Sequence, residues 1–131
     1  MSRRVICIDD DKTIGEIFQF AIGDSFEFKF ISDETLGVSE CVKFDPNVVF
    51  LDLNLPSIEG FELMNELRNA GVSATFVFIS ADERSDKIDA MIKLSDCGFM
   101  RKPLDVKDIA DTAKFAVSLN KILRLTGRDD G

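Results

Sequence analysis

The chain contains no histidine among its 131 residues. Histidine is the side chain most often used as a general base, and it is also the most common metal ligand. Neither role can be filled by histidine from within this chain. Chemistry at any site must therefore rely on carboxylates, hydroxyls and amines.

Cysteine is scarce as well. Cys7, Cys41 and Cys97 stand singly, and their spacings match neither a zinc site nor a disulfide framework. We expect all three to be small buried side chains in a protein from a reducing compartment.

Long apolar runs and excess positive charge are also lacking. Arg3 and Arg4 precede an apolar run of only four residues, so no signal peptide is expected, and no segment has the length of a membrane span. The net charge of −8 opposes binding to a nucleic-acid backbone, which needs clustered Lys and Arg. These features favour a cytoplasmic protein without direct contacts to membrane or nucleic acid.

The residues that are present predict one α/β domain. Hydrophobic residues make up 45% of the chain, which suffices for a single core at this length. Short apolar runs at residues 5–8, 48–51 and 76–79 are typical of strands buried on both faces of a parallel sheet. Residues 26–31 alternate apolar and charged side chains, which indicates an edge strand. A short fifth strand is predicted over residues 97–100.

Apolar stripes of helical period lie between these strands. The first helix is predicted to begin near Lys12 and to end at Gly23. The others are predicted over residues 36–44, 61–67, 88–94 and 106–119, the last with a pattern that allows continuation to Leu125. Strict alternation of strands and helices predicts right-handed crossovers and a three-layer doubly wound fold. We assign residues 1–120 to the domain and residues 121–131 to a helix end, linker or tail, with residues 126–131 polar and frayed.

Polar side chains follow four of the predicted strands. In open α/β sheets the functional groups gather outside the carboxyl ends of the strands. The side chains expected at this edge are Asp9, Asp10, Asp11, Asp52, Ser80 and Lys102. One edge of the sheet thus receives acids, a hydroxyl and a cation.

Most of these residues have an ordinary explanation when taken alone. Asp11 before a helix is typically an N-cap, Ser80 a cap or turn residue, and Lys102 a solvated charge. Asp52 is different because it closes a run of four apolar residues, where an unpaired carboxylate is costly. A partner or a function is therefore favoured for Asp52.

Converging carboxylates repel one another unless a cation neutralises them. With only oxygen donors at hand, Mg²⁺ is the expected ion. A carboxylate neutralised in this way can act as a nucleophile toward phosphorus. The Ser80 hydroxyl, the Lys102 ammonium and the Mg²⁺ would then stabilise the oxygens of a phosphoryl group.

Four motifs carry a family resemblance. They are VICIDD at residues 5–10, VFLDLNLP at residues 49–56, FISA at residues 78–81 and FMRKP at residues 99–103. In this order and at these separations they resemble the receiver domains of bacterial two-component response regulators, with single-domain chemotaxis-type regulators as the nearest form. The resemblance covers residues 4–118. It implies a (βα)5 flavodoxin-like sandwich with strand order 2-1-3-4-5.

The resemblance also implies residue roles. Asp52 would be the phosphoacceptor, and Asp10 and Asp52 would bind Mg²⁺ directly. Asp9 would act mainly through a bound water, and Asn54 would contribute its backbone carbonyl.

A switch is implied in the same way. Lys102 would bind the phosphoryl group and Ser80 would be the switch hydroxyl. Phe99 would be the switch aromatic, although an aromatic residue on a short strand is also ordinary core. Movement of Ser80 would let Phe99 rotate and would remodel the surface formed by residues 88–94, 97–100 and 106–119.

Because the chain lacks histidine, the phosphohistidine donor must be another protein, either a sensor histidine kinase or a histidine phosphotransfer protein. The output would be a downstream domain or a target protein, and the chain is either a free-standing regulator or part of a longer one. Apolar Ile122, Leu123 and Leu125 fit a linker or a homodimer contact through the same surface, and fit ordinary helix packing equally well.

The chain departs from the family pattern at two points, and two further positions bear on the lifetime of the phosphoryl group in the family. Ser95-Asp96 stand where many relatives have Gly-Ala. Phe99 lacks the hydroxyl of tyrosine. Asn54 and Asp82 hold positions that influence the lifetime of the phosphoryl group.

Three alternative functions differ in the residues that they require. A haloacid-dehalogenase-type phosphatase would need a second aspartate where Asn54 stands. A flavin or dinucleotide module would need a glycine-rich loop after the first strand, where this chain is acidic. A receiver-like docking module that no longer takes phosphate stays open as the alternative.

Overall fold

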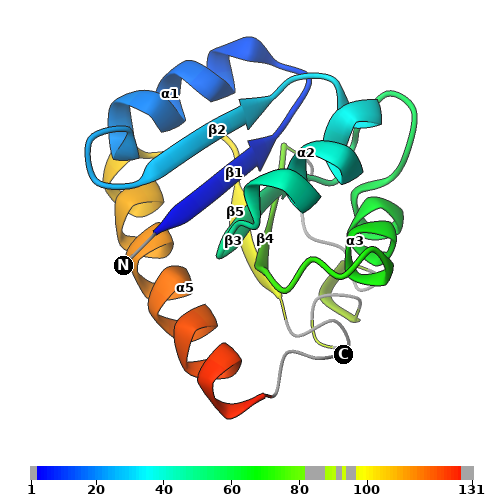
Figure 1. The fold of residues 1–131 in the computed structure, drawn as a ribbon. Helices are drawn as coiled ribbons and strands as arrows, with labels where there is room; N and C mark the ends of the chain where they lie inside the picture. Colours follow the sequence, from blue (N-terminus) through cyan, green and yellow to red (C-terminus); the bar gives the residue numbers. More distant parts are fainter. Residues whose placement is uncertain (1–2, 82–87, 91–92, 94–96, 128–131) are drawn as a thin grey trace.

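The computed structural model describes residues 3–81, 88–90, 93 and 97–127 of the chain (Figure 1). Five strands form one parallel sheet in the order β2-β1-β3-β4-β5. Their bounds are β1 Arg4–Ile8, β2 Glu27–Ile31, β3 Val48–Asp52, β4 Thr75–Ser80 and β5 Gly98–Arg101. The predicted doubly wound, flavodoxin-like fold and its strand order are confirmed.

Helices cover both faces of the sheet. The helical elements are α1 Lys12–Ile22, the 3-10 helix η1 Glu34–Leu36, α2 Gly37–Phe44, α3 Gly60–Asn69 and α5 Val106–Thr126. Helices α1 and α5 lie on one face of the sheet, and α2 and α3 lie on the other (Figure 1). Of the helix predicted over residues 88–94, residues 88–90 and 93 are helical, and the others lie outside the described residues.

The core consists of two apolar layers, one on each face of the sheet. Successive side chains of a strand point to opposite faces. Ile6 and Ile8 therefore pack toward α2 and α3, whereas Val5 and Cys7 pack toward α1 and α5. This two-sided burial explains why the sequences of β1, β3 and β4 are continuously apolar.

Strand β2 is an edge strand, as its alternating sequence predicts. Phe28 and Phe30 pack on the layer beneath α1 and α5. Lys29 forms an ion pair with Glu40 of α2. The strand begins at Glu27, and Phe26 before it is buried.

Capping residues set the ends of the helices. The Asp11 carboxylate accepts a hydrogen bond from the Thr13 N–H, which makes Asp11 the predicted N-cap of α1. Helix α5 runs without a break to Thr126, so the assignment of Thr126 to a frayed tail is wrong. No helix in the described part of the chain is both long and apolar enough to cross a membrane.

The cysteine prediction holds for two of the three residues. Cys7 and Cys41 are buried, and all three thiols are free. Burial raises the pKa of Cys41 to about 12, so its thiol is protonated. Cys97 is only half-buried because it directly precedes the short β5 strand at the edge of the sheet, and its Sγ lies 3.5 Å from the Met64 Sδ.

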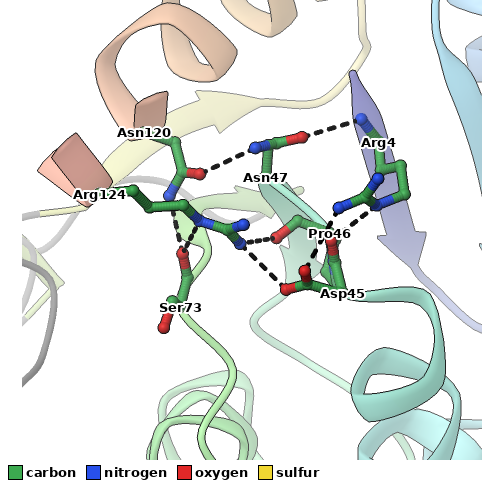
Figure 2. Close-up of polar contacts among 7 residues, drawn as sticks. All are labelled: Arg4, Asp45, Pro46, Asn47, Ser73, Asn120 and Arg124. Atoms are coloured by element: carbon green, nitrogen blue, oxygen red, sulfur yellow. Dashed lines mark hydrogen bonds and ion pairs between the residues drawn. The ribbon is translucent and has the colours of Figure 1, made fainter. Parts of the chain in front are cut away.

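A polar network joins α5 to the amino ends of the strands (Figure 2). The buried Asn47 side chain donates to the Asn120 Oδ1 at 3.1 Å, and Asn120 donates to the Ser73 carbonyl at 2.8 Å. Arg124 donates to the Pro46 carbonyl at 2.9 Å and pairs with Asp45 at 3.2 Å. These contacts fix the second half of α5 at the end of the sheet opposite the predicted site.

Candidate functional site

Three carboxylates meet at the carboxyl ends of β1 and β3. Asp9 follows β1, Asp10 is next in sequence, and Asp52 is the last residue of β3. One carboxylate oxygen from each of the three lies within 4.8 Å of the others. The structure thus brings together the acidic residues that the sequence predicts there.

The three carboxylates differ in exposure. Asp9 is fully buried, Asp52 is 5% exposed and Asp10 is exposed. The Asp9 Oδ1 accepts a hydrogen bond from the Asp11 N–H at 2.9 Å. Its Oδ2 forms an ion pair with the Lys102 Nζ at 2.8 Å but accepts no well-aligned hydrogen bond from the described residues. A buried carboxylate oxygen that accepts no hydrogen bond can still take a cation or a hydrogen-bond donor as a further partner.

Asp52 is held by both of its oxygens. Oδ1 accepts a hydrogen bond from the Asn54 N–H at 3.1 Å, and Oδ2 lies 3.5 Å from the Lys102 Nζ. Burial raises the pKa of Asp52, and the negative charge of Asp9 adds to the shift, while the Asn54 N–H and Lys102 oppose it. A cation at this position would favour the ionised form that a nucleophile requires.

Lys102 is placed by the connection that leaves β5. Its backbone N–H donates to the Ser80 carbonyl at 2.8 Å, and its peptide bond to Pro103 is cis. Burial lowers the pKa of the ammonium, but the contacts with Asp9 and Asp52 outweigh burial and raise it overall. Lys102 is therefore a fixed positive charge between these two carboxylates.

Ser80 and Asn54 extend the site toward β4. Ser80 is the last residue of β4 and is fully buried. The Asn54 side-chain amide donates to the Ser80 Oγ at 3.5 Å, a long contact. Asn54 thus contacts Asp52 through its backbone and Ser80 through its side chain. The metal-binding role of the Asn54 carbonyl and the switch role of Ser80 stay predictions.

Phe99 lies in the middle of β5, in register with Phe78 of β4. Phe99 is half-buried and packs against the layer beneath α3, and it is also one of the residues that line a surface groove of about 300 Å³ between β5 and α5. Leu104 and Thr112 line the same groove. This position at the edge of the core is compatible with the predicted switch, which stays a prediction. Asp82 and the Ser95-Asp96 departure lie outside the described residues.

The loop of residues 53–59 connects β3 to α3. The Gly60 N–H donates to the Leu53 carbonyl at 2.9 Å, and Asn54 and Glu59 form an antiparallel bridge. A Cβ on Gly60 would lie 2.6 Å from the Asp52 carbonyl oxygen, so the close approach requires glycine.

The sequence analysis missed Glu34 as a partner of this loop. The Glu34 carboxylate is buried, and its Oε2 accepts hydrogen bonds from the Ser57 N–H at 2.7 Å and the Ser57 Oγ at 2.9 Å. No local pattern reveals this contact because the two residues are 23 positions apart.

The donors at this site fit a hard divalent cation. The three clustered side chains offer only carboxylate oxygens, and neither histidine nor a cysteine thiolate is among them. Oxygen ligands of this kind suit Mg²⁺. One exposed carboxylate, Asp10, leaves the cluster accessible from solvent.

Comparisons with known proteins agree with this geometry. The family model described as "Response regulator receiver domain" matches residues 5–114. The DNA-binding response regulator MtrA of Mycobacterium tuberculosis is 27% identical over 112 residues, which cover 83% of this chain and 48% of MtrA. The chain therefore spans about half the length of this curated relative.

Solved structures show the same fold. The signal receiver domain of a putative LuxO repressor protein from Vibrio parahaemolyticus superposes with a TM-score of 0.86 at 14% identity, covering 96% of this chain and 98% of that one. NtrX from Brucella abortus gives a TM-score of 0.85 at 21% identity, covering 97% of this chain and 30% of NtrX. With its sheet order, its acidic cluster and a family match over residues 5–114, the chain belongs to the receiver domains of two-component response regulators.

Proposed function

We propose that Asp52 accepts a phosphoryl group from a phosphohistidine on a sensor histidine kinase or a histidine phosphotransfer protein. The observation that supports this most directly is the cluster of Asp9, Asp10 and Asp52, with Lys102 between two of its members. Mg²⁺ would be held by Asp10, Asp52 and the Asn54 carbonyl, with Asp9 acting mainly through a bound water. When bound, the ion neutralises the carboxylates and the phosphoryl oxygens.

In the transfer step an oxygen of the Asp52 carboxylate attacks phosphorus. The bond between phosphorus and the donor imidazole breaks, and its electron pair stays on the imidazole nitrogen, which afterwards takes up a proton. Lys102 shifts from Asp9 toward a phosphoryl oxygen, and the Ser80 hydroxyl donates to another. The chain catalyses only its own phosphorylation and dephosphorylation in this proposal.

The phosphoryl group would act on the surface around β5 and α5. The Ser80 hydroxyl moves toward the phosphoryl oxygens, and the Phe99 side chain then rotates into the vacated space. Unchanged NMR signals for Phe99 on phosphorylation would contradict this switch.

The output is a downstream domain or a target protein of the cytoplasm. We propose residues 1–120 as the receiver and residues 121–131 as the link to that partner or to a second copy. Ile122 and Leu125 are exposed on α5, which supports a contact role over ordinary packing for these two side chains.

Intact-protein mass spectrometry tests the proposed phosphorylation. The protein is incubated with acetyl phosphate, with and without Mg²⁺, and Asp52→Asn is compared with Asp111→Asn, which removes an exposed aspartate on α5. We expect the gain of one labile phosphoryl group in the wild type and in Asp111→Asn only when Mg²⁺ is present. No gain by a folded wild-type protein that binds Mg²⁺ would favour a docking module that takes no phosphate.

A further inference from the structure

Glu34 is a buried carboxylate outside the acidic cluster, yet it contacts the loop that follows the phosphoacceptor. It is the first residue of η1 and is 7% exposed. Both hydrogen bonds from Ser57 end on one oxygen, Oε2, at 2.7 and 2.9 Å. Within the described ranges, no Lys or Arg forms an ion pair with Glu34. Hydrogen bonds alone compensate this charge.

Burial of a carboxylate without a counter-ion is costly unless hydrogen bonds compensate for the lost hydration. For Glu34 the hydrogen bonds outweigh the cost of burial, and the two that come from another residue both come from Ser57. The presence of a carboxylate with two bonds to one residue therefore points to a need for fixing that residue.

Ser57 lies in the middle of the loop of residues 53–59. The base of this loop is closed by the bond between Gly60 and Leu53 and by the bridge between Asn54 and Glu59. Glu34, which precedes β3 in the sequence, accepts hydrogen bonds from Ser57 and so holds the middle of the loop as well. Because the loop is held at its base and at its middle, the backbone of Asn54 within it has little freedom to move.

We propose that Glu34 is a positioning residue that fixes the Asn54 backbone through Ser57 and thereby sets the affinity of the site for Mg²⁺. This inference rests on the proposed function, which gives the Asn54 carbonyl a place among the ligands. Partners of this indirect kind orient metal ligands, and their loss typically weakens metal binding by roughly 10- to 100-fold.

Substitutions at residue 34 distinguish two possible effects on Mg²⁺ affinity: the hydrogen bonds that position Ser57, and the negative charge of Glu34. Glutamine can keep both hydrogen bonds through its single carbonyl oxygen while it removes the charge, whereas alanine removes both. Glu40→Gln serves as the matched control because it removes a carboxylate from the neighbouring α2 that pairs with Lys29 instead. The Mg²⁺ dissociation constant is measured by titration with Mg²⁺ alone, followed by the NMR signals of the Asp52 and Asn54 amides.

We expect Glu34→Ala to raise the dissociation constant by roughly tenfold. Glu34→Gln should restore most of the affinity, and Glu40→Gln should match the wild type. Signals from β1 and α1 that are unchanged in Glu34→Ala would show that the fold is intact.

Two results would overturn the inference. An unchanged dissociation constant in Glu34→Ala would show that the loop needs no such restraint, and an equal loss in Glu34→Gln would show that charge matters rather than position. If Glu34→Ala does not fold, Ser57→Ala replaces it, and unchanged affinity in Ser57→Ala would overturn the inference too. Failure of the wild type to bind Mg²⁺ would instead contradict the proposed function itself.

Discussion

The Lys102 Nζ lies 2.8 Å from the Asp9 Oδ2 and 3.5 Å from the Asp52 Oδ2. The ammonium is therefore closer to the fully buried Asp9 than to the proposed phosphoacceptor. Lys102 stabilises the resting fold through Asp9 and is near enough to Asp52 to meet a phosphoryl group there. We therefore expect Lys102 to serve both the stability of the fold and the proposed phosphoryl transfer.

Replacement of Lys102 by methionine should separate these two roles. Asp9 would be left buried without its counter-ion, so we expect the free energy of unfolding to fall by about 3 kcal/mol. Mg²⁺ should bind more tightly because the cation that competes with it is gone. Urea unfolding without metal and calorimetric titration with Mg²⁺ measure both effects.

Lys107→Met is the control for that experiment, because Lys107 pairs with Asp111 on the exposed face of α5. Its loss should change stability by less than about 1 kcal/mol. A Lys102→Met protein as stable as the control, with unaltered Mg²⁺ affinity, would contradict the assigned role of Lys102.

Gly60→Ala should disturb the loop of residues 53–59, which follows Asp52. The new Cβ would meet the Asp52 carbonyl oxygen at 2.6 Å and the Leu53 Cα at 2.9 Å, and backbone atoms cannot move aside cheaply. We expect a loss of about 1–3 kcal/mol in stability, measured by urea unfolding, and weaker Mg²⁺ binding. In Gly37→Ala the nearest atom, from Ile8, is 3.5 Å away, so this control should be close to neutral. Equal stability of the two variants would show that the loop is not tightly fixed.

The stability contributed by Glu34 should depend on pH. Burial raises the pKa of this carboxyl, but hydrogen bonds from Ser57 and from its own N–H outweigh burial and lower the pKa overall. A lowered folded-state pKa means that the contribution is fully present above the unfolded value of about 4.3 and is lost as the pH falls through the folded value. Urea unfolding of the wild type and of Glu34→Gln should differ at neutral pH, and the difference should shrink in acid. A difference that is the same at every pH would argue against an ionised Glu34.

The fold was predictable because its signals are local. Continuous apolar runs predicted β1, β3 and β4, because strands buried on both faces need apolar side chains at every position. Alternation in residues 26–31 predicted the edge strand, because only one of its faces is buried. The candidate site was predictable for the same reason. Asp52 ends a strand, and parallel strands deliver their carboxyl ends to one edge.

Contacts between distant residues were not predictable in this way. Glu34 meets Ser57, and Asn47 meets Asn120, only after the chain has folded, and neither pair has a sequence spacing of its own. Asn120 does leave one trace, because it follows Ala116 and Val117 on the buried stripe of α5, where a polar side chain needs a partner.

Asn120→Ala should destabilise the protein without affecting phosphorylation. It would leave the buried Asn47 amide without its acceptor and the Ser73 carbonyl without one donor (Figure 2). We expect a loss of about 1–3 kcal/mol in the free energy of unfolding. Phosphorylation by acetyl phosphate should persist because Asn47 and Asn120 lie at the amino ends of the strands, whereas Asp52 lies at the carboxyl ends. The exposed Ser118→Ala is the control, and an Asn120→Ala protein equal to it in stability would contradict the role of this pair.

Chemical trapping of the phosphoryl group tests directly whether Asp52 itself carries it. Borohydride reduces an acyl phosphate on aspartate to the alcohol, homoserine, which tandem mass spectrometry of peptides can place in the sequence. After treatment with acetyl phosphate and Mg²⁺, we expect homoserine at position 52 and at neither position 9 nor position 10. Homoserine at position 9 or 10, or at no position in a protein that binds Mg²⁺, would contradict this role of Asp52.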